Sequence, residues 1–157
     1  WLFNLEISQI EIIVHPQSII HSMVQFKDGS IKAQLGVPDM KIPIQYALTY
    51  PRHLPSKWER LDFKTIGDLT FEAPNFERFP CIKLAYDVLE KMGTAPAVLN
   101  FANDYCVYRF LREEIKFTDI PRIIEDALGN HSWLKNPKLE DIKNLDYWTK
   151  DFVNNFD

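Results

Sequence analysis

Four helical segments in the second half of the chain constrain its fold more than any other feature of the sequence. Each segment is bounded by the proline, threonine or glycine residues that are typical of helix starts and stops. Within each segment, apolar side chains recur three and four residues apart, so every helix has one face to bury. The expected helices cover 80–92, 94–114, 118–129 and 137–156. Because short links join them, the sequence predicts a four-helix bundle.

The same pattern predicts caps and buried stripes. Thr94 and Thr118 are expected to cap the second and third helices. Gly93 and Gly129 are expected to end the first and third. One buried stripe is expected in the second helix, at Leu99, Ala102, Cys106 and Phe110. Another is expected in the last helix, at Leu139, Ile142, Leu145, Trp148 and Phe152.

The first part of the sequence has strand character instead. Residues 9–16 read as a short buried strand that stops at a proline. The segments 21–26 and 30–36 flank an Asp28-Gly29 turn, and together they predict a β-hairpin. In the second of these strands, apolar and polar residues alternate, so one face is expected to pack while the other meets solvent or a cleft.

A further helix is expected after the hairpin, with Asp39 as its cap and Pro51 at its end. The stretch that follows, as far as Pro80, looks like an extended connection with a possible short strand at 68–71. The fold class is therefore expected to be α+β. A β-rich segment reaches to about residue 75, and the helical bundle follows it.

Charge and cysteine content exclude several classes. The 157-residue chain has a formal charge of −4, whereas a nucleic-acid-binding protein needs a basic surface, so no nucleic acid partner is expected. Its apolar runs are far shorter than the roughly 20 residues of a membrane span, so no membrane partner is expected. Cys81 and Cys106 have no zinc-ligand spacing and are expected to be buried, reduced thiols.

Two segments could carry chemistry. Residues 15–23, HPQSIIHSM, place two histidines and two serines in an apolar run, where polar groups need partners or a purpose. Spacing alone leaves both explanations open. The GVPDM segment at 36–40 is also open, since Asp39 can cap a helix before a core Met40, or Met40 can lie against a flat ring. Gly-rich phosphate loops and HExxH or GxSxG motifs are missing from the sequence.

Three long stretches resemble one enzyme family and follow the family's order. They are IEIIVHPQSIIHSMVQFKDGSIKAQLGVPDMKIPIQYALTYP at 10–51, LTFEAPNFERFPCIKLAYDVL at 69–89 and GTAPAVLNFAN at 93–103. The family is 1-deoxy-D-xylulose 5-phosphate reductoisomerase, an enzyme of the methylerythritol phosphate route to isoprenoids. From about Lys138 the final helix matches only in character. Three residues, Tyr105, Cys106 and Tyr108, look bulkier than those usual in the family.

The resemblance implies an NADPH-binding N-terminal domain, a central catalytic and dimerisation domain, and a C-terminal helical bundle. Residues 1–75 would be the last part of the catalytic domain with its connection, and 76–157 the bundle. The chain is expected to be a fragment, because it starts at Trp1 and WLFN looks like the end of a helix. The cofactor loop, the phosphate ligands and the Mg²⁺ or Mn²⁺ ligands would all precede Trp1, so no metal ligand is expected in the chain.

The family's reaction implies a phosphorylated ketose as substrate. A metal-chelated 1-deoxy-D-xylulose 5-phosphate rearranges its carbon skeleton, and NADPH then reduces the aldehyde to 2-C-methyl-D-erythritol 4-phosphate. The resemblance also implies a homodimer, located in the bacterial cytoplasm or the plastid stroma. The isolated fragment is expected to be inactive. The alternative is a non-catalytic oligomerisation module that keeps the sheet and bundle but has lost the chemistry.

The resemblance assigns supporting roles to four residues. Ser18 and His21 match positions in the active-site wall, where His21 would orient a carboxylate ligand of the metal. Pro38 and Met40 match positions that pack near the nicotinamide ring. His15 keeps its structural interpretation. The hairpin turn falls in the β-region that pairs across the family's dimer.

Overall fold

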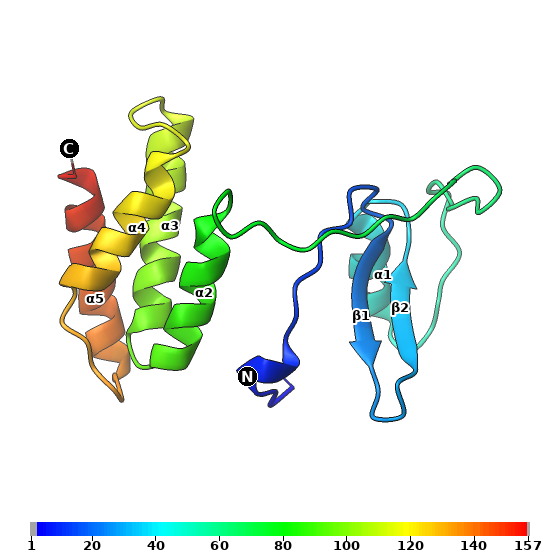
Figure 1. Cartoon of the computed structure of the whole chain (residues 1–157), viewed down its shortest axis with the longest axis horizontal. Helices are drawn as coiled ribbons and strands as arrows, with labels where there is room; N and C mark the ends of the chain where they lie inside the picture. The colour runs from blue at the N-terminus through cyan, green and yellow to red at the C-terminus, as the bar shows by residue number, and fades with distance from the viewer. Residues whose placement is uncertain (1–2, 157) are drawn as a thin grey trace. The chain divides into compact units, whose positions relative to one another are not determined.

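The computed structural model describes residues 3–156 of the chain, and they form two compact units (Figure 1). One unit is built from the described residues up to Glu11 together with those from Asn75 onward. The other is Ile12–Pro74. The first unit is helical, and the second contains a two-stranded sheet and a helix, so the predicted α+β class is confirmed.

The helical unit holds four long helices side by side (Figure 1), which are α2 (Pro80–Lys91), α3 (Ala95–Leu111), α4 (Asp119–Asn130) and α5 (Leu139–Asn154). A short 3-10 helix, η1 (Ile7–Gln9), contacts α2. Prolines stand in the first turns of α2 and α3, where no helical hydrogen bond is lost. The predicted four-helix bundle is confirmed. However, α3 ends before residue 114, and Gly129 lies within α4 rather than ending it.

The core of the helical unit is centred on α3, which packs against both α4 and α5. Three side chains of α3 are fully buried there, Val98, Ala102 and Cys106. They belong to one cluster with side chains of the two flanking helices, Ile120, Ile123, Ile124, Ala127, Leu145 and Val153. Burying an aliphatic side chain of this size stabilises a fold by about 1.5–3 kcal/mol. This cluster therefore holds the three helices together.

Three members of the predicted stripes lie outside this core, namely Phe110, Leu139 and the half-buried Ile142. Phe110 is 37% exposed and packs edge-on against Phe117, with ring centroids 5.7 Å apart. Leu139 is 72% exposed at the first position of α5. The residues of α5 that are buried are Leu145, Thr149 and Val153. The predicted stripes therefore fail in the last turn of α3 and the first turn of α5, and hold elsewhere in the two helices.

The two threonines expected to be helix caps stand at the N-cap positions of α3 and α4, but neither side chain makes a capping hydrogen bond. Thr94 has helical backbone angles, and its hydroxyl accepts a hydrogen bond from the backbone N–H of Leu134 at 3.0 Å. Thr118 is also helical. At that end of α4, the Asp119 carboxylate accepts from the backbone N–H of Lys116 at 2.9 Å. A capping side chain usually needs an extended backbone to reach the first N–H groups, so the predicted cap positions are confirmed but the capping hydrogen bonds are not formed.

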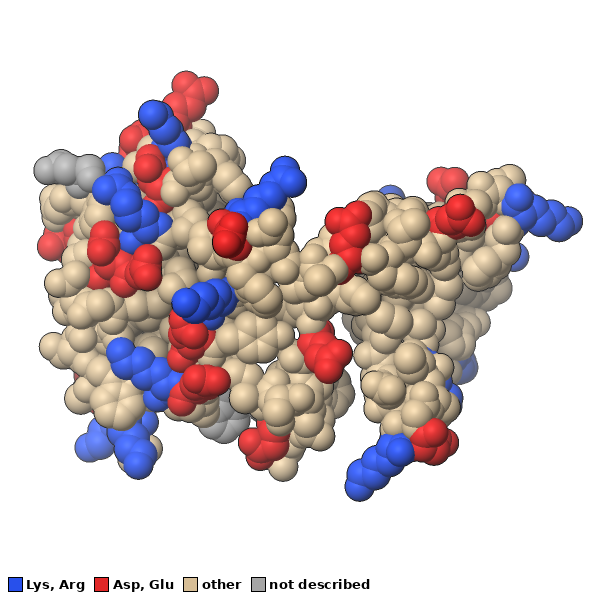
Figure 2. All heavy atoms as spheres, viewed as in Figure 1, with Lys and Arg blue, Asp and Glu red and all other residues tan. Residues whose placement is uncertain are grey.

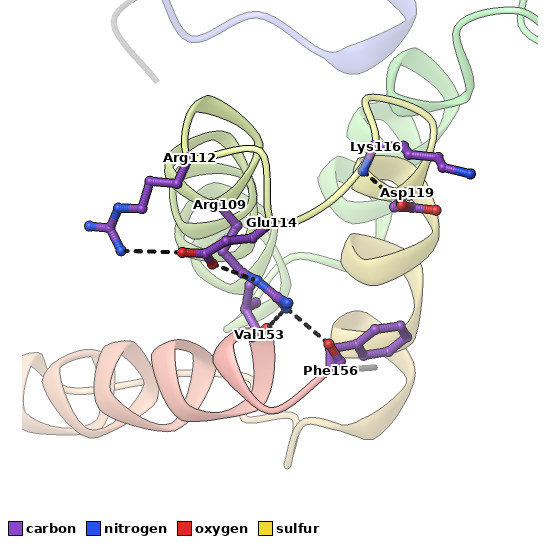
Figure 3. Close-up of polar contacts among 7 residues, drawn as sticks. All are labelled: Arg109, Arg112, Glu114, Lys116, Asp119, Val153 and Phe156. Carbon is purple, nitrogen blue, oxygen red and sulfur yellow. Dashed lines mark hydrogen bonds and ion pairs between the residues drawn. The ribbon is translucent and has the colours of Figure 1, made fainter.

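Polar contacts tie α3 to α5 (Figure 3). The guanidinium of Arg109 donates to the carbonyl oxygens of Val153, at 2.5 Å, and Phe156, at 3.0 Å. One turn earlier, the Tyr105 hydroxyl donates to the Asp146 carboxylate at 2.7 Å. This hydrogen bond is the main reason why the pKa of Tyr105 is raised to about 12. The Tyr105 side chain thus links α3 to α5.

Both cysteines are free thiols, as predicted. Cys106 is buried and Cys81 is half-buried. Burial raises the pKa of Cys106 to about 11, and it raises the pKa of Cys81 as well. Because the thiolate is the nucleophilic form, thiols with a raised pKa are unreactive near neutral pH.

Ile12–Pro74 begins as an antiparallel hairpin and continues into a helix. β1 (Ile20–Gln25) pairs with β2 (Ile31–Leu35), and α1 (Lys41–Thr49) follows (Figure 1). The Asp28 carboxylate accepts hydrogen bonds from the backbone N–H and the hydroxyl of Ser30, at 2.9 and 2.6 Å. Gly29 adopts a φ of 84°, which glycine tolerates without strain. The predicted hairpin, its turn and the helix after it are confirmed.

Three expectations for the β-rich part are wrong. Residues 9–16 form no buried strand, since Ile10, Ile12 and Ile13 are exposed and only Val14 makes a bridge, to Glu72. The stretch 68–71 forms no strand either. No side chain of β2 is buried, so neither of its faces packs within the described residues. A strand needs neighbours that satisfy its backbone groups, and the described residues supply these segments with one bridge.

The expected helix end at WLFN lies partly outside the described residues. In its described part, Asn4 has a φ of 50°, the left-handed conformation that glycine and asparagine often adopt directly after a helix.

Charged side chains of both signs are mixed over the helical unit on the face drawn in Figure 2. That face carries no extended basic area of the kind that a phosphate backbone requires. Among residues 3–156, none of the helices combines the length and the apolar character needed to cross a bilayer.

Candidate functional site

Ser18 lies at the end of a tight turn. Its backbone N–H donates to the carbonyl oxygen of His15 at 3.0 Å, with Pro16 at the second position of the turn. Ser18 has a φ of 51°, in the left-handed region that residues other than glycine rarely adopt. Its side chain is exposed. A backbone of this kind persists only where the surrounding structure holds it in place.

The turn is docked on a segment more than fifty residues further along the chain. The Nδ1–H of His15 donates to the carbonyl oxygen of Thr70 at 2.8 Å. The His15 ring stacks on Phe71, with centroids 5.0 Å apart. The amide Nε2 of Gln17 donates to the Thr70 hydroxyl at 2.8 Å. These contacts support the structural role that the sequence analysis expected for His15.

His21 occupies an irregularity in the hairpin. The pairing register moves by one residue between Ile20 and Ser22, which makes His21 the extra residue of a β-bulge. Bulges redirect side chains and are frequent beside active sites. The His21 side chain is exposed. Its Nε2 lies 3.9 Å from the position where Gly36 would carry a Cβ, which is an ordinary van der Waals distance.

The VPDM segment forms a compact turn in front of α1. The backbone N–H of Asp39 donates to the carbonyl oxygen of Val37 at 2.7 Å, which places Pro38 at the centre of the turn. The Asp39 carboxylate accepts from the backbone N–H of Lys41 at 3.0 Å, and this bond lowers the pKa of Asp39. Met40 is 70% exposed, so the alternative of a core methionine is wrong within the described residues.

The hairpin brings the two segments to the same end of the sheet. The backbone N–H of Gly36 donates to the carbonyl oxygen of Ile19 at 3.0 Å, one pair beyond the ladder of β1 and β2. Ser18 immediately precedes this pair on one strand, and Pro38 follows it closely on the other. The four predicted residues therefore lie on two adjacent chain segments.

A pocket of about 560 Å³ opens between β2, α1 and the stretch after α1. Aromatic side chains contribute to its wall, and Tyr46 stacks on His53 with ring centroids 4.3 Å apart. None of the four predicted residues lines it. The predicted site is thus an exposed edge of this unit, distinct from its pocket.

The described residues do not fit a complete metal site, because they contain no group of three or more His, Cys, Asp or Glu side chains that could hold an ion. Pro38 and Met40 do fit one side of a flat ring. Both are exposed, and a thioether offers a soft apolar surface. Ser18 and His21 add two exposed hydrogen-bonding groups on the adjacent segment.

Reasoning from the sequence missed the bulge at His21 and the docking of the turn on Thr70. The side chains of His15 and Gln17 reach across 55 and 53 residues of sequence. No local pattern signals such pairs.

Comparison with known proteins gives a consistent result. The family model described as the DXP reductoisomerase C-terminal domain matches residues 35–152. A 1-deoxy-D-xylulose 5-phosphate reductoisomerase of Acetivibrio thermocellus is 54% identical over 153 residues, which are 98% of this chain and 40% of the relative. The corresponding protein of Chloroherpeton thalassium is 52% identical over the same shares of the two chains.

Solved structures agree with the sequence comparisons. The reductoisomerase of Zymomonas mobilis, solved in complex with NADPH, has a TM-score of 0.88 and 42% identity. A DOX-P reductoisomerase solved with NADPH, fosmidomycin and magnesium has a TM-score of 0.91 and 37% identity. Each covers 98% of this chain, while this chain spans about 40% of their length. With a family model matched over most of its residues and relatives about half identical to it, this chain belongs to the 1-deoxy-D-xylulose 5-phosphate reductoisomerase family.

Proposed function

We propose that this chain acts as part of an NADPH-dependent reductoisomerase that converts 1-deoxy-D-xylulose 5-phosphate to 2-C-methyl-D-erythritol 4-phosphate. The observation that carries the proposal is the 54% identity to a reductoisomerase over 98% of the chain. Since the chain spans about 40% of that relative, the proposal gives it one wall of the active site and the C-terminal bundle. Residues 1–75 would belong to the catalytic domain and 76–157 to the bundle.

Four residues would form this wall. His21, which the bulge leaves exposed, would donate a hydrogen bond that orients a carboxylate contributed by another part of the enzyme. Ser18, with its exposed hydroxyl, would hydrogen-bond the bound substrate. The apolar surfaces of Pro38 and Met40 would lie against the nicotinamide and exclude water from that side.

The cofactor and metal would be held mainly by other residues. NADPH supplies the hydride when bound. The part of the chain that the structure describes offers it only the apolar surface at Pro38 and Met40, and offers Mg²⁺ or Mn²⁺ no cluster of ligands. We therefore expect this chain by itself neither to bind NADPH nor to turn over substrate.

A chimera tests the proposal. The 153 aligned residues of the Acetivibrio thermocellus reductoisomerase would be replaced by this chain, and NADPH oxidation would be followed with substrate and Mn²⁺. We expect turnover by the chimera and none by this chain alone. A folded chimera without turnover would favour the non-catalytic oligomerisation module instead. Turnover by this chain alone would contradict the proposal that the chain supplies only one wall of the active site.

His21→Ala in the chimera tests the role of the imidazole. We expect turnover to fall by about 10- to 100-fold, because second-shell partners of metal ligands typically contribute this much. The melting temperature should change little, since the side chain is exposed. Ser22→Ala, at the next position of β1, is the matched control and should retain turnover. Unchanged kinetics with a lower melting temperature would assign His21 a structural role only.

The proposed enzyme is a homodimer of the cytoplasm or the plastid stroma. The support for a dimer is the hairpin, whose apolar side chains Met23, Val24, Phe26 and Ile31 are exposed within the described residues. Sedimentation of the chimera as a monomer at the concentrations of the assay would contradict it.

A further inference from the structure

Gln17 holds the turn that carries Ser18 to a distant segment through both ends of its amide. The Nε2 group donates to the Thr70 hydroxyl at 2.8 Å, and Oε1 accepts from the Thr70 backbone N–H at 3.2 Å. The carbonyl oxygen of Thr70 accepts from His15 at 2.8 Å. The backbone N–H, the carbonyl and the hydroxyl of Thr70 are thus all engaged by this turn.

The turn needs these contacts to keep its backbone conformation. Ser18 adopts the left-handed conformation, with φ of 51°, and nothing in a serine side chain favours it. Gln17 is the residue immediately before it and is half-buried, whereas Ser18 is exposed. A bidentate amide fixes both the position and the orientation of the chain at Gln17. Its neighbour therefore enters the strand at a defined angle.

The strand that follows transmits this placement. Ile19 accepts from the backbone N–H of Gly36 at 3.0 Å, and His21 is the bulged residue two positions further on. A shift of the turn would move Ser18 directly. It would also move the strand residues that lead into the bulge at His21. The contacts of Gln17 with Thr70 are therefore placed to control both hydrogen-bonding residues of the proposed site.

We propose that Gln17, held by Thr70, is a positioning residue that sets the geometry of Ser18 and His21 for the reaction. The proposal rests on the proposed function and deepens it, since Gln17 itself would touch neither substrate nor cofactor. Displacements of about 1 Å at groups far from the chemistry can lower turnover about 100-fold, so the effect should be large enough to measure.

Two variants of Gln17 in the chimera test the proposal, with Gln25→Met as a control. Gln17→Met keeps the length of the side chain and removes all of its hydrogen bonds to Thr70. Gln17→Glu keeps two oxygens that can accept from the Thr70 N–H and hydroxyl, so it is the conservative rescue. Gln25 is an exposed glutamine at the end of β1, and no side-chain hydrogen bond of it is found within the described residues.

In Gln17→Met we expect kcat to fall by about 10- to 100-fold while KM for NADPH stays within about twofold, because Pro38 and Met40 lie on the other segment. Hydrogen exchange of the 15–22 segment, followed by mass spectrometry, should quicken in the same variant. Gln17→Glu should restore most of kcat, and Gln25→Met should match the unsubstituted chimera.

The outcomes separate this proposal from the proposed function. An unsubstituted chimera that folds but shows no turnover would overturn the proposed function, and the positioning role of Gln17 with it. An active chimera in which Gln17→Met retains kcat overturns the positioning role alone. A loss of kcat in Gln17→Met that Gln17→Glu does not rescue, accompanied by a lower melting temperature, would overturn it as well, because the residue would then serve stability only.

Discussion

Gly93 stands at the corner between α2 and α3 with a φ of 61°. The stretch before α5 folds over this corner. The indole N–H of Trp133 donates to the carbonyl oxygen of Met92 at 3.1 Å, and Thr94 and Leu134 exchange two hydrogen bonds at 3.0 Å. A Cβ on Gly93 would overlap the carbonyl oxygen of Leu134 and would lie 2.9 Å from the Trp133 indole nitrogen. The corner therefore requires glycine for its backbone and for its lack of a side chain.

Gly93→Ala should lower the free energy of unfolding by at least about 2 kcal/mol. The left-handed backbone alone costs about 1–2 kcal/mol for an L-residue, and the overlap adds to it. Urea unfolding followed by Trp fluorescence measures the change. Gly129→Ala, within α4 with nothing near the added Cβ, is the control and should be neutral or stabilising by up to about 1 kcal/mol. Equal effects of the two substitutions would contradict this account.

At the scale of secondary structure, the end of α5 depends on a side chain of α3. The last carbonyl groups of a helix have no partners within it, and here Arg109 supplies donors to two carbonyl oxygens, those of Val153 and Phe156 (Figure 3). Glu114 pairs with the same guanidinium at 3.3 Å. Because the Arg109 side chain is only 13% exposed, water cannot easily replace it.

Arg109→Met should destabilise the bundle by about 1.5–3 kcal/mol, since it removes charge-assisted hydrogen bonds to the carbonyl oxygens of Val153 and Phe156. Arg112→Met is the matched control. Its guanidinium is 70% exposed and lies 3.9 Å from Glu114, so its removal should change stability by less than about 1 kcal/mol. Chemical unfolding monitored by circular dichroism gives both values. A larger loss at Arg112 than at Arg109 would refute the role assigned to this contact.

At the scale of the whole molecule, burial is divided unequally between the two units. Every residue that is buried among those described lies between Val88 and Val153, in the helical unit. None of Ile12–Pro74 is buried. A hairpin of two strands is only marginally stable by itself, because it cannot shield an apolar face.

Residues 75–157 expressed alone should therefore unfold cooperatively in urea, with the helical circular dichroism of a bundle. Residues 12–74 expressed alone should show no cooperative transition. Comparing the two unfolding curves tests this directly. A cooperative transition in 12–74 and none in 75–157 would show that burial has been assigned to the wrong unit.

The sequence by itself determined the helices, the hairpin and the family. Helix periodicity and turn chemistry are local, so the four helices and the Asp28-Gly29 turn could be read from neighbouring residues. The motifs at 10–51 and 69–89 are also continuous stretches of sequence, and they were sufficient to identify the family. Ser18, His21, Pro38 and Met40 came from that resemblance, since spacing alone left their segments open.

Only the tertiary structure decided how those residues are held. The bonds of Gln17 and His15 with Thr70 join groups 53 and 55 residues apart, and the Arg109 contacts join groups 44 and 47 residues apart. The bulge at His21 depends on the register of a partner strand. The hydroxyl of Thr94 accepts a hydrogen bond from a distant backbone N–H rather than from its own helix. Such contacts form only when the chain is folded, because their partners are set by packing and not by sequence neighbours.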